Sequence, residues 1–325
     1  MKMRRRELLS TGLVATAGAL TAAPAVAQAF PNKPIRWIIP FAAAGNYDVT
    51  SRLVGEAMGR RLGQTVIPDN RPGAGGVVGL DVAASAPADG YTVVMGSFSV
   101  LWIAPYMAGK PSMVPMFTPI SMLTTVPMVI VAKADGRFAD FKAVLTEARA
   151  KPGTVSIGHA GNGTTNHLAI LRLQANEKVQ FNIIPYKGSG PGLADLLSGQ
   201  TDLYTDQLTT SLPQIRAGKL KALLVVSPDR IPQLPDVPCL KDIGSQPFDG
   251  GTTAGLFARV ETPVAALDVL NAAVVGALRD EEVARKLVEM GAVVRPTSRA
   301  EFAAYMKEQE AGVSELVKSG LLKPE

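Results

Sequence analysis

The chain has 325 residues, a formal net charge of +5 and a single cysteine. A lone cysteine excludes an intramolecular disulfide, and a chain of this length favours two cores over one. From Phe30 onward 29 basic and 27 acidic residues remain, without a Lys/Arg run, so the charge gives no indication of nucleic-acid binding.

The first 29 residues are typical of an export signal. Residues 2–6 carry four basic side chains, an apolar stretch covers residues 8–20, and Ala27-Gln28-Ala29 is a small-x-small cleavage signal. The apolar stretch is too short and too rich in Ala and Thr for a membrane anchor. Arg5-Arg6 also fits a twin-arginine signal, so both export routes stay open. We expect cleavage after Ala29 and a periplasmic product.

Short β-rich runs alternate with helical runs, which indicates an α/β fold with largely parallel sheets. The expected strands are Ile35–Ile39, Thr65–Ile67, Thr92–Met95, Met128–Ala132, Val155–Ile157, Phe181–Ile184, Leu203–Thr205, Ala222–Val226 and Gly255–Phe257. The first helix is expected from Val49 to a stop at Gly63. Three helices close the chain, over Pro263–Leu278, Glu281–Met290 and Arg299–Lys318.

Two strand–loop–helix units, far apart in the sequence, carry the functional prediction. Residues 41–48 form a small-residue loop before the first helix, and residues 159–165 form a loop of Gly, Asn and Thr before another apolar-periodic helix. The first turn of a helix has unpaired N–H groups at the positive end of the helix dipole, which favours anion binding. We expect these loops to be the two lips of one cleft. The pattern favours binding over catalysis.

Other polar residues follow expected strands. Ser97 and Ser99 come after the strand Thr92–Met95, at the strand end where ligands bind in open α/β sheets. Asp206 takes the same kind of position after another strand, and a hinge hydrogen bond is its equal alternative. Tyr47 and Trp102 are candidates for an aromatic wall, with core packing as the alternative.

Two segments are expected to cross between lobes. Val126–Val131 leaves the first α/β unit, and Thr252–Ala258 returns after a Pro-rich stretch and Gly250-Gly251. This pattern predicts a discontinuous lobe 1 of residues 30–126 plus 252–325, an inserted lobe 2 of residues 127–251, and a two-strand hinge.

The sequence offers little for catalysis. His159 and His167 are the two histidines of the chain, and there is no zinc-type spacing and no Gly-x-Ser-x-Gly elbow. We therefore expect no enzyme activity, no metal and no cofactor. The glycine run Gly73–Gly79 resembles a dinucleotide-binding turn. However, the next strand ends at Gly96-Ser97 without an acidic residue for ribose hydroxyls, so an exported nucleotide-cofactor oxidoreductase is the weaker alternative.

Short motifs recur along the whole chain in a characteristic order. They are Pro34-Ile35-Arg36, Leu62-Gly63-Gln64, Asp69–Gly76 (DNRPGAGG), Ala86–Thr92 (APADGYT), Gly161–Leu168 (GNGTTNHL), Pro185–Gly188 (PYKG), Leu196–Leu203 (LLSGQTDL) and Ile215–Leu220 (IRAGKL). Together they resemble the Bug/TctC family, the periplasmic substrate-binding proteins of tripartite tricarboxylate transporters. The resemblance implies a two-lobed Venus-flytrap (periplasmic-binding-protein) fold, each lobe a mixed, mostly parallel sheet flanked by helices.

The resemblance also implies a ligand carboxylate held between the two loops by backbone groups and ordered waters. Carried over by position, the lips are Phe41, Ala43, Ala44, Gly45, Asn46, Tyr47 and Asp48, and His159, Ala160, Gly161, Asn162, Gly163, Thr164 and Thr165. Asp48 caps its helix or accepts a hydrogen bond from the ligand. The first loop departs from the family, because Ala42–Asn46 stands where a proline and a glycine pair are usual. We therefore expect a ligand other than citrate, such as an aromatic or smaller carboxylate.

The implied partners are a small carboxylate, aromatic or aliphatic, and the membrane permease subunits of the transporter, with the chain itself a monomer. A periplasmic receptor that signals to a membrane sensor stays an open alternative, since either partner would dock on the outer faces of the lobes.

Overall fold

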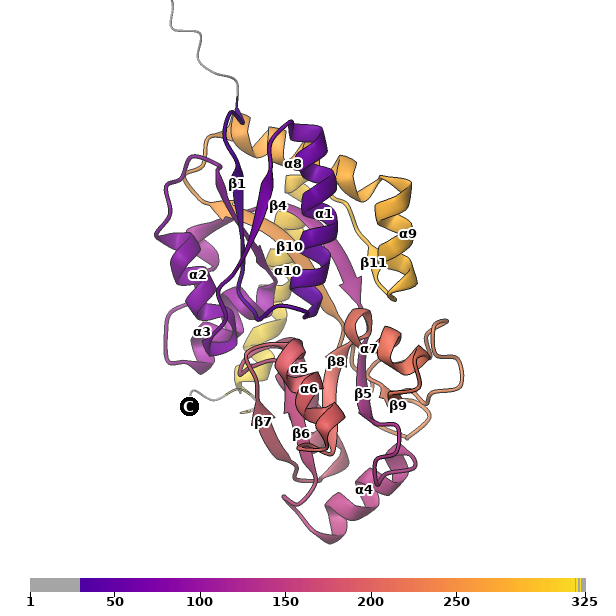
Figure 1. The fold of residues 1–325 in the computed structure, drawn as a ribbon. Coiled ribbons are helices and arrows are strands. Elements are labelled where there is room, and N and C mark those ends of the chain that lie inside the picture. The colour runs from indigo at the N-terminus through magenta and orange to yellow at the C-terminus, as the bar shows by residue number, and fades with distance from the viewer. Residues whose placement is uncertain (1–29, 319, 321, 323–325) are drawn as a thin grey trace, which may run out of the picture.

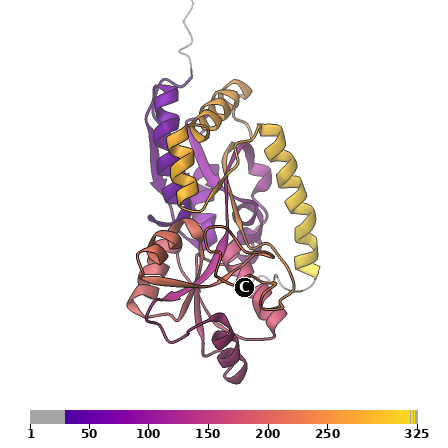
Figure 2. The same ribbon diagram turned by 90° about the vertical axis from the view of Figure 1, so that its right-hand side faces the viewer.

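A computed structural model describes residues 30–318, 320 and 322, so the predicted export signal lies outside the described residues. The chain forms two lobes, each built on one β-sheet with helices against it (Figures 1 and 2). The six-stranded sheet has the order β11 (Val293–Val294), β4 (Phe117–Val126), β10 (Thr252–Arg259), β3 (Thr92–Gly96), β1 (Ile35–Ile39) and β2 (Val66–Asn70). The five-stranded sheet has the order β7 (Asn182–Pro185), β6 (Ser156–His159), β8 (Leu203–Gln207), β5 (Met128–Lys133) and β9 (Leu220–Val225).

The helices divide between the two sheets. Those of the six-stranded lobe are α1 (Asn46–Leu62), α2 (Val77–Ala84), α3 (Ala104–Met107), α8 (Val264–Leu278), α9 (Glu281–Glu289) and α10 (Arg299–Lys318), with short turns at Ala74–Gly76, Ser99–Ile103 and Val114–Met116. Those of the five-stranded lobe are α4 (Phe141–Ala150), α5 (Thr165–Glu177), α6 (Ser189–Ser198) and α7 (Leu208–Arg216). In the described residues no helix is both long and apolar enough to span a bilayer.

The chain passes between the lobes at two places. Val126, the last residue of β4, pairs with Thr252, whereas Met128, the first residue of β5, pairs with Gln207 in the other sheet. The chain returns through β10. Both entering strands, β5 and β10, run antiparallel to their neighbours, while the strands β1 to β3 and β6 to β8 are parallel within their sheets. We propose that the hinge and the predicted lobe boundaries lie at these two crossings.

Each expected strand has a counterpart in the structure; Ile35–Ile39 has the bounds expected, the others have shifted ends, and β4 and β11 were not expected. The prediction that the first helix starts at Val49 is wrong, because α1 begins at Asn46. Gly45 is its extended N-cap residue, and the carboxylate of Asp48 accepts a hydrogen bond from the Ala44 N–H at 2.9 Å. An acid in the first turn stabilises a helix start, so three residues assigned to the loop join the helix. Gly63 ends α1 at φ 64°, as expected.

Candidate ligand-binding site at four helix N-termini

Both predicted lips border a small chamber between the lobes, which we call the inner chamber. It has a volume of about 30 Å³, room for one or two water-sized groups. Its walls are Phe41, Gly45, Asn46, Tyr47, Ser99, Val100, Ala160, Thr164, Thr165, Asn166, Gly188, Ser189, Gln207 and Thr252. None of these side chains is acidic or basic, so any charge preference must come from the backbone.

The backbone supplies a positive field, because four helices begin at the inner chamber. These are α1, α5, α6 and α7, whose N-cap residues Gly45, Thr164, Gly188 and Gln207 all line it. Each helix start carries unpaired N–H groups and roughly half a positive charge. Sequence reasoning expected two of these helix starts and missed those of α6 and α7. The PYKG motif, which ends at the N-cap residue Gly188, was a signal that could have revealed the start of α6.

Asn46 presents a buried hydrogen-bond donor at the inner chamber. Its side chain is 3 % exposed, and its Oδ1 accepts a hydrogen bond from the Thr209 hydroxyl at 2.8 Å. Its Nδ2 is fully enclosed and has no partner among the described residues. An unsatisfied buried donor costs roughly 1–3 kcal/mol, which an acceptor in the chamber would recover. The first lip therefore offers an amide donor in addition to its backbone.

A network of hydroxyl and amide groups connects the second lip to the hinge. The hydroxyls of Thr165 and Thr252 lie 2.5 Å apart, and Gln207 Nε2 donates to Asn166 Oδ1 at 2.9 Å and to Thr252 Oγ1 at 3.2 Å. Thr164 caps α5, since its Oγ1 accepts from the His167 N–H and donates to Gly161 O at 2.6 Å. The side chain of Thr164 is thus committed to its own loop, whereas Thr165 and Gln207 link α5 and β8 to the start of β10.

Asp48 stabilises the first lip from behind. Its two carboxylate oxygens accept from the Ala44 N–H and from Arg52 Nε, each at 2.9 Å, and it does not line the inner chamber. Burial raises the pKa of Asp48, but these hydrogen bonds outweigh burial and hold the pKa below its ordinary value. Of the two roles considered for Asp48, helix capping fits this geometry and a hydrogen bond to the ligand does not.

Ala43 and Ala44 are exposed at the rim of the first lip, where the Ala43 carbonyl faces Gly190 of α6.

His159 lies beneath the second lip with no exposed surface. Its Nδ1 accepts from the Gly161 N–H at 3.2 Å, and its ring stacks on His167 with centroids 4.5 Å apart. Burial, together with the neighbouring His167, lowers the pKa of His159 to about 3, so the ring is neutral. Of the predicted second lip, Ala160, Thr164 and Thr165 line the inner chamber, and His159, Gly161, Asn162 and Gly163 lie outside its walls.

Asp206 is fully buried near the end of β8 and lines neither this chamber nor the larger cavity beside it. The hydroxyls of Thr210 and Ser211 donate to its Oδ2 at 2.5 Å each, and burial raises its pKa. Trp102 stacks between Phe98 and Tyr106, at 6.2 and 5.3 Å, which is side-chain packing. Of the two aromatic candidates, Tyr47 is the one that lines the inner chamber.

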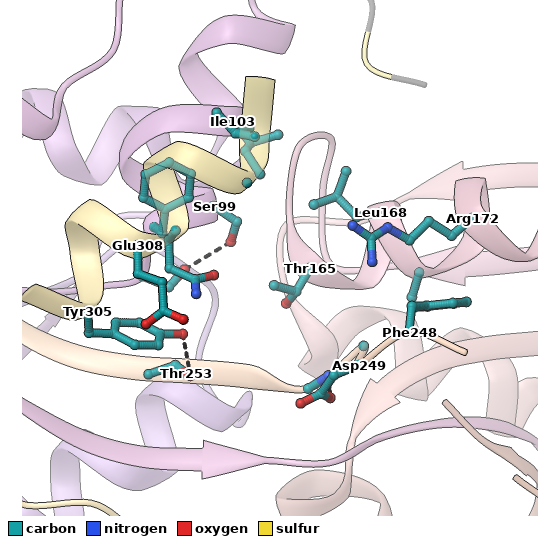
Figure 3. Close-up of a pocket in the computed structure, with 18 residues that line it drawn as sticks. Ser99, Ile103, Thr165, Leu168, Arg172, Phe248, Asp249, Thr253, Tyr305 and Glu308 are labelled. Atoms are coloured by element: carbon teal, nitrogen blue, oxygen red, sulfur yellow. Dashed lines mark hydrogen bonds between the residues drawn. The ribbon is translucent and has the colours of Figure 1, made fainter. Parts of the chain in front are cut away.

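A larger cavity of about 290 Å³ adjoins the inner chamber, and we call it the hinge cavity (Figure 3). Ser99 and Thr165 line both spaces. Its walls are Ser97 to Ser99 and Ile103; Thr165, Leu168, Ala169 and Arg172 of α5; Phe248 to Gly251 and Thr253 of the returning segment; and Tyr305, Glu308, Gln309, Gly312 and Val313 of α10. Apart from Thr165, sequence reasoning missed the α5 and α10 walls, because i, i+3, i+4, i+7 spacing is equally typical of core packing.

The two lobes are in direct contact around these spaces. The Ala42 N–H donates to Lys187 O at 2.9 Å, and an ideal Cβ on Gly163 would lie 2.4 Å from Ala104 Cα. Gly75 approaches Asn162 O so closely that its ideal Cβ would lie 2.0 Å away. The structure is therefore a closed form. The close backbone approaches of the Gly73–Gly79 run are to protein atoms such as Asn162 O and Pro40, which is a packing role and does not require a dinucleotide.

The fold and the chamber define a two-lobed solute-binding protein of the periplasmic type, closed over a site at helix N-termini. The chain belongs to the tripartite tricarboxylate transporter family receptors (TctC), whose family model matches residues 50–321. The resemblance to the Bug/TctC family is thereby confirmed. This is a family of receptors and not of enzymes. In the described part of the chain, no group of three or more His, Cys, Asp or Glu side chains is arranged to hold a metal ion.

Two relatives illustrate the match. A protein from the tcbD-tcbE intergenic region of Pseudomonas sp. strain P51 is 36 % identical over 295 residues, covering 89 % of this chain and 86 % of the relative. Protein BugT of Bordetella pertussis is 33 % identical over 324 residues, covering 96 % of this chain and 97 % of BugT.

Two solved structures confirm the fold. MatC from Rhodopseudomonas palustris, with bound malate, has a TM-score of 0.82 at 31 % identity and covers 89 % of this chain and all of its own. Rpa4515 from R. palustris, with adipate, has a TM-score of 0.86 at 26 % identity and covers 91 % of this chain and all of its own.

Proposed function

We propose that the protein captures a small carboxylated solute in the periplasm and delivers it to the membrane permease of a tripartite tricarboxylate-type transporter. The observation that carries the proposal is the convergence of four helix N-termini on a chamber without acidic or basic side chains. Such a site attracts an anion through N–H groups and helix dipoles. Malate and adipate, bound by two similar proteins, are both carboxylates.

The volume of the inner chamber defines which part of the ligand it receives. About 30 Å³ accommodates a single carboxylate group, with the Asn46 amide as a donor, and nothing much larger. The rest of the ligand extends past Ser99 and Thr165 into the hinge cavity. The protein does not change the ligand chemically. The ligand binds the closed form of the protein better than the open form and so shifts the equilibrium between the two forms. Export with cleavage after Ala29, a monomeric state and the permease partner are parts of the same proposal.

The test is a thermal-shift screen of the mature protein, refolded to remove carried-over ligand. The panel holds mono-, di- and tricarboxylates, aromatic acids and nicotinamide cofactors. A ligand at 100 times its Kd adds about 2.7 kcal/mol to the free energy of unfolding and raises Tm by a few degrees. We expect carboxylates to raise Tm. A shift with nicotinamide cofactors alone would overturn the proposal in favour of an exported oxidoreductase.

Asn46→Asp adds a site-specific arm to the screen. An aspartate keeps the acceptor for Thr209 and suits the first turn of α1, so the variant is expected to fold. Its negative charge lies in the inner chamber, where it repels a bound carboxylate, and the ligand-induced Tm shift should disappear. Asn182→Asp is the matched control, because Asn182 is exposed on β7 in the other lobe. An undiminished shift in Asn46→Asp would place the carboxylate elsewhere.

A further inference from the structure

Arg172 differs from most arginines of the described chain. Arg149, for example, pairs with Glu177 at 3.0 Å, and Arg137 binds both Asp202 and Glu147. Arg172 is half-buried, and among the described residues its one interaction is with the Phe248 ring, whose centroid lies 5.3 Å from Cζ. A cation that is partly removed from water without a counter-ion loses hydration, and burial accordingly lowers the pKa of Arg172. No described residue supplies Arg172 with the anionic partner that would compensate for that loss.

The position of Arg172 connects it to the inner chamber. Both Thr165 and Arg172 belong to the same face of α5, seven residues apart, which is about 10 Å along a helix axis. Side chains of a helix lean toward its N-terminus, which shortens this separation. Figure 3 shows the Arg172 guanidinium turned into the hinge cavity on the side of Thr165. A ligand that leaves the inner chamber past Thr165 therefore meets this guanidinium.

Two carboxylates also line the hinge cavity. Glu308 lies on the α10 wall, opposite Arg172 in Figure 3, and Asp249 lies in the returning segment, where its Oδ1 accepts from the Gly251 N–H at 2.7 Å. Both are exposed, so water screens them, whereas Arg172 is half-buried beside Phe248. Neither carboxylate forms an ion pair with Arg172. The wall that Arg172 and Phe248 form is thus the positive part of the cavity.

We infer that the hinge cavity is a second anion subsite, in which Arg172 binds a distal carboxylate of the same ligand, so that the protein selects dicarboxylates over monocarboxylates of equal length. The inference rests on the proposed function, because it places the first carboxylate in the inner chamber. The guanidinium fork matches a carboxylate bidentately, and the Phe248 ring lies beside it, with its centroid 5.3 Å from Cζ. The apolar surfaces of Leu168 and Phe248 suit the hydrocarbon between the two carboxylates.

The experiment compares two pairs of ligands of equal carbon number by isothermal titration: succinate with butyrate, and adipate with hexanoate. Two carboxyl carbons are about 4 Å apart in extended succinate and about 6 Å apart in extended adipate. Because the helix separation is about 10 Å before the arginine leans back, we expect the preference for the diacid to be at least tenfold in the adipate pair and small in the succinate pair.

Arg172→Met retains an apolar stem against Phe248 and removes the charge. In this variant the diacid should lose at least tenfold in affinity, while the matched monoacid keeps its wild-type affinity. Arg149→Met is the control, since it removes one cation of the same lobe outside both cavities and should preserve the preference. Glu308→Gln removes the opposing charge and should strengthen diacid binding up to threefold.

Each remaining outcome is decisive. If no carboxylate binds the wild type, the proposed function fails. If carboxylates bind without any preference for diacids, or if Arg172→Met weakens diacid and monoacid equally, the proposed function stands and the distal subsite is refuted. Arg172→Lys separates charge from geometry: recovery of only part of the preference is expected, because an ammonium lacks the planar fork.

Discussion

The two lips perform the same task by different physical means. The first, before α1, is held by a charge: Asp48 binds the Ala44 N–H and Arg52. The second, before α5, is held by neutral groups: Thr164 caps the helix, and His159 accepts from Gly161 while stacking on His167. The first lip therefore depends on an ionised carboxylate, and the second depends on unprotonated imidazole. They should fail under different conditions.

The lips also differ in the residues that they place against the opposite lobe. The rim of the first lip is exposed at Ala43 and Ala44 and carries methyl groups, one of them on a residue at φ 62°. The second lip has glycine at φ 135° and 74°, and Gly163 lies against the backbone of Ala104 across the cleft. Both lips contact the opposite lobe through backbone, since an ideal Cβ on Gly190 would lie 2.4 Å from Ala43 O. The exposed methyl groups of the first lip nevertheless leave room for sequence variation, whereas Gly163 in the second lip has no room for an added Cβ.

The largest effect is expected for Gly163→Ala. Its added Cβ would lie 2.4 Å from Ala104 Cα, a contact that exists only when the lobes are closed. Overpacking of this kind costs about 1–3 kcal/mol, which would weaken carboxylate binding about 5- to 150-fold in isothermal titration. The positive φ adds a cost to stability in the open and closed forms alike, so it does not change affinity.

Gly153→Ala is the matched control for that variant. Gly153 has φ 77° in the same lobe, but nothing lies within 4 Å of its ideal Cβ. It should lose a similar 1–2 kcal/mol of stability and keep its affinity. If both variants bound ligand equally well, the closed contact at Gly163 would not limit binding.

The next largest effect is expected in the pH dependence of stability, and it should arise from His159 in the second lip. The folded pKa of His159, about 3, lies below the ordinary value of 6.5, so the unfolded chain takes up the proton first as the pH falls. Stability is therefore complete above pH 6.5 and declines below it, by about 2 kcal/mol between pH 7 and pH 5. Urea denaturation at the two pH values measures this loss.

His159→Asn preserves an acceptor for the Gly161 N–H and does not titrate, so this decline should largely vanish. Asp48→Asn should retain it. The pKa of Asp48 is lowered on folding, so the stability it contributes is present above pH 3.8 and is lost only as the pH falls further. A decline of equal size in His159→Asn would show that other groups cause it.

The sequence predicted the features that are local. Strand–loop–helix signals at residues 41–48 and 159–165 identified the loops, and the family motifs implied the fold. It could not predict what depends on distant packing. The start of α6 at Ser189 reaches the inner chamber only because β6, β7 and β8 are neighbours in the sheet. Likewise, Arg172 and Glu308 face one cavity only because α10 returns across the hinge, and neither has a local motif.

The smallest effect concerns the departure of the first lip from its family. Ala44 occupies φ 62°, which costs an L-residue about 1–2 kcal/mol, so Ala44→Gly removes that strain. Glycine also gives the unfolded chain more conformational freedom, which offsets about 0.5–1 kcal/mol of that gain. We therefore expect the free energy of unfolding, measured by urea denaturation, to rise by about 0.5 kcal/mol. Ala43→Gly is the neighbouring control without a positive φ, and it should lose about 0.5 kcal/mol because only the unfolded chain changes. Affinity should stay constant in both variants, since neither methyl group lines the inner chamber. A change in affinity with Ala44→Gly alone would instead show that this methyl group contacts the ligand, and the altered first lip would then determine specificity directly.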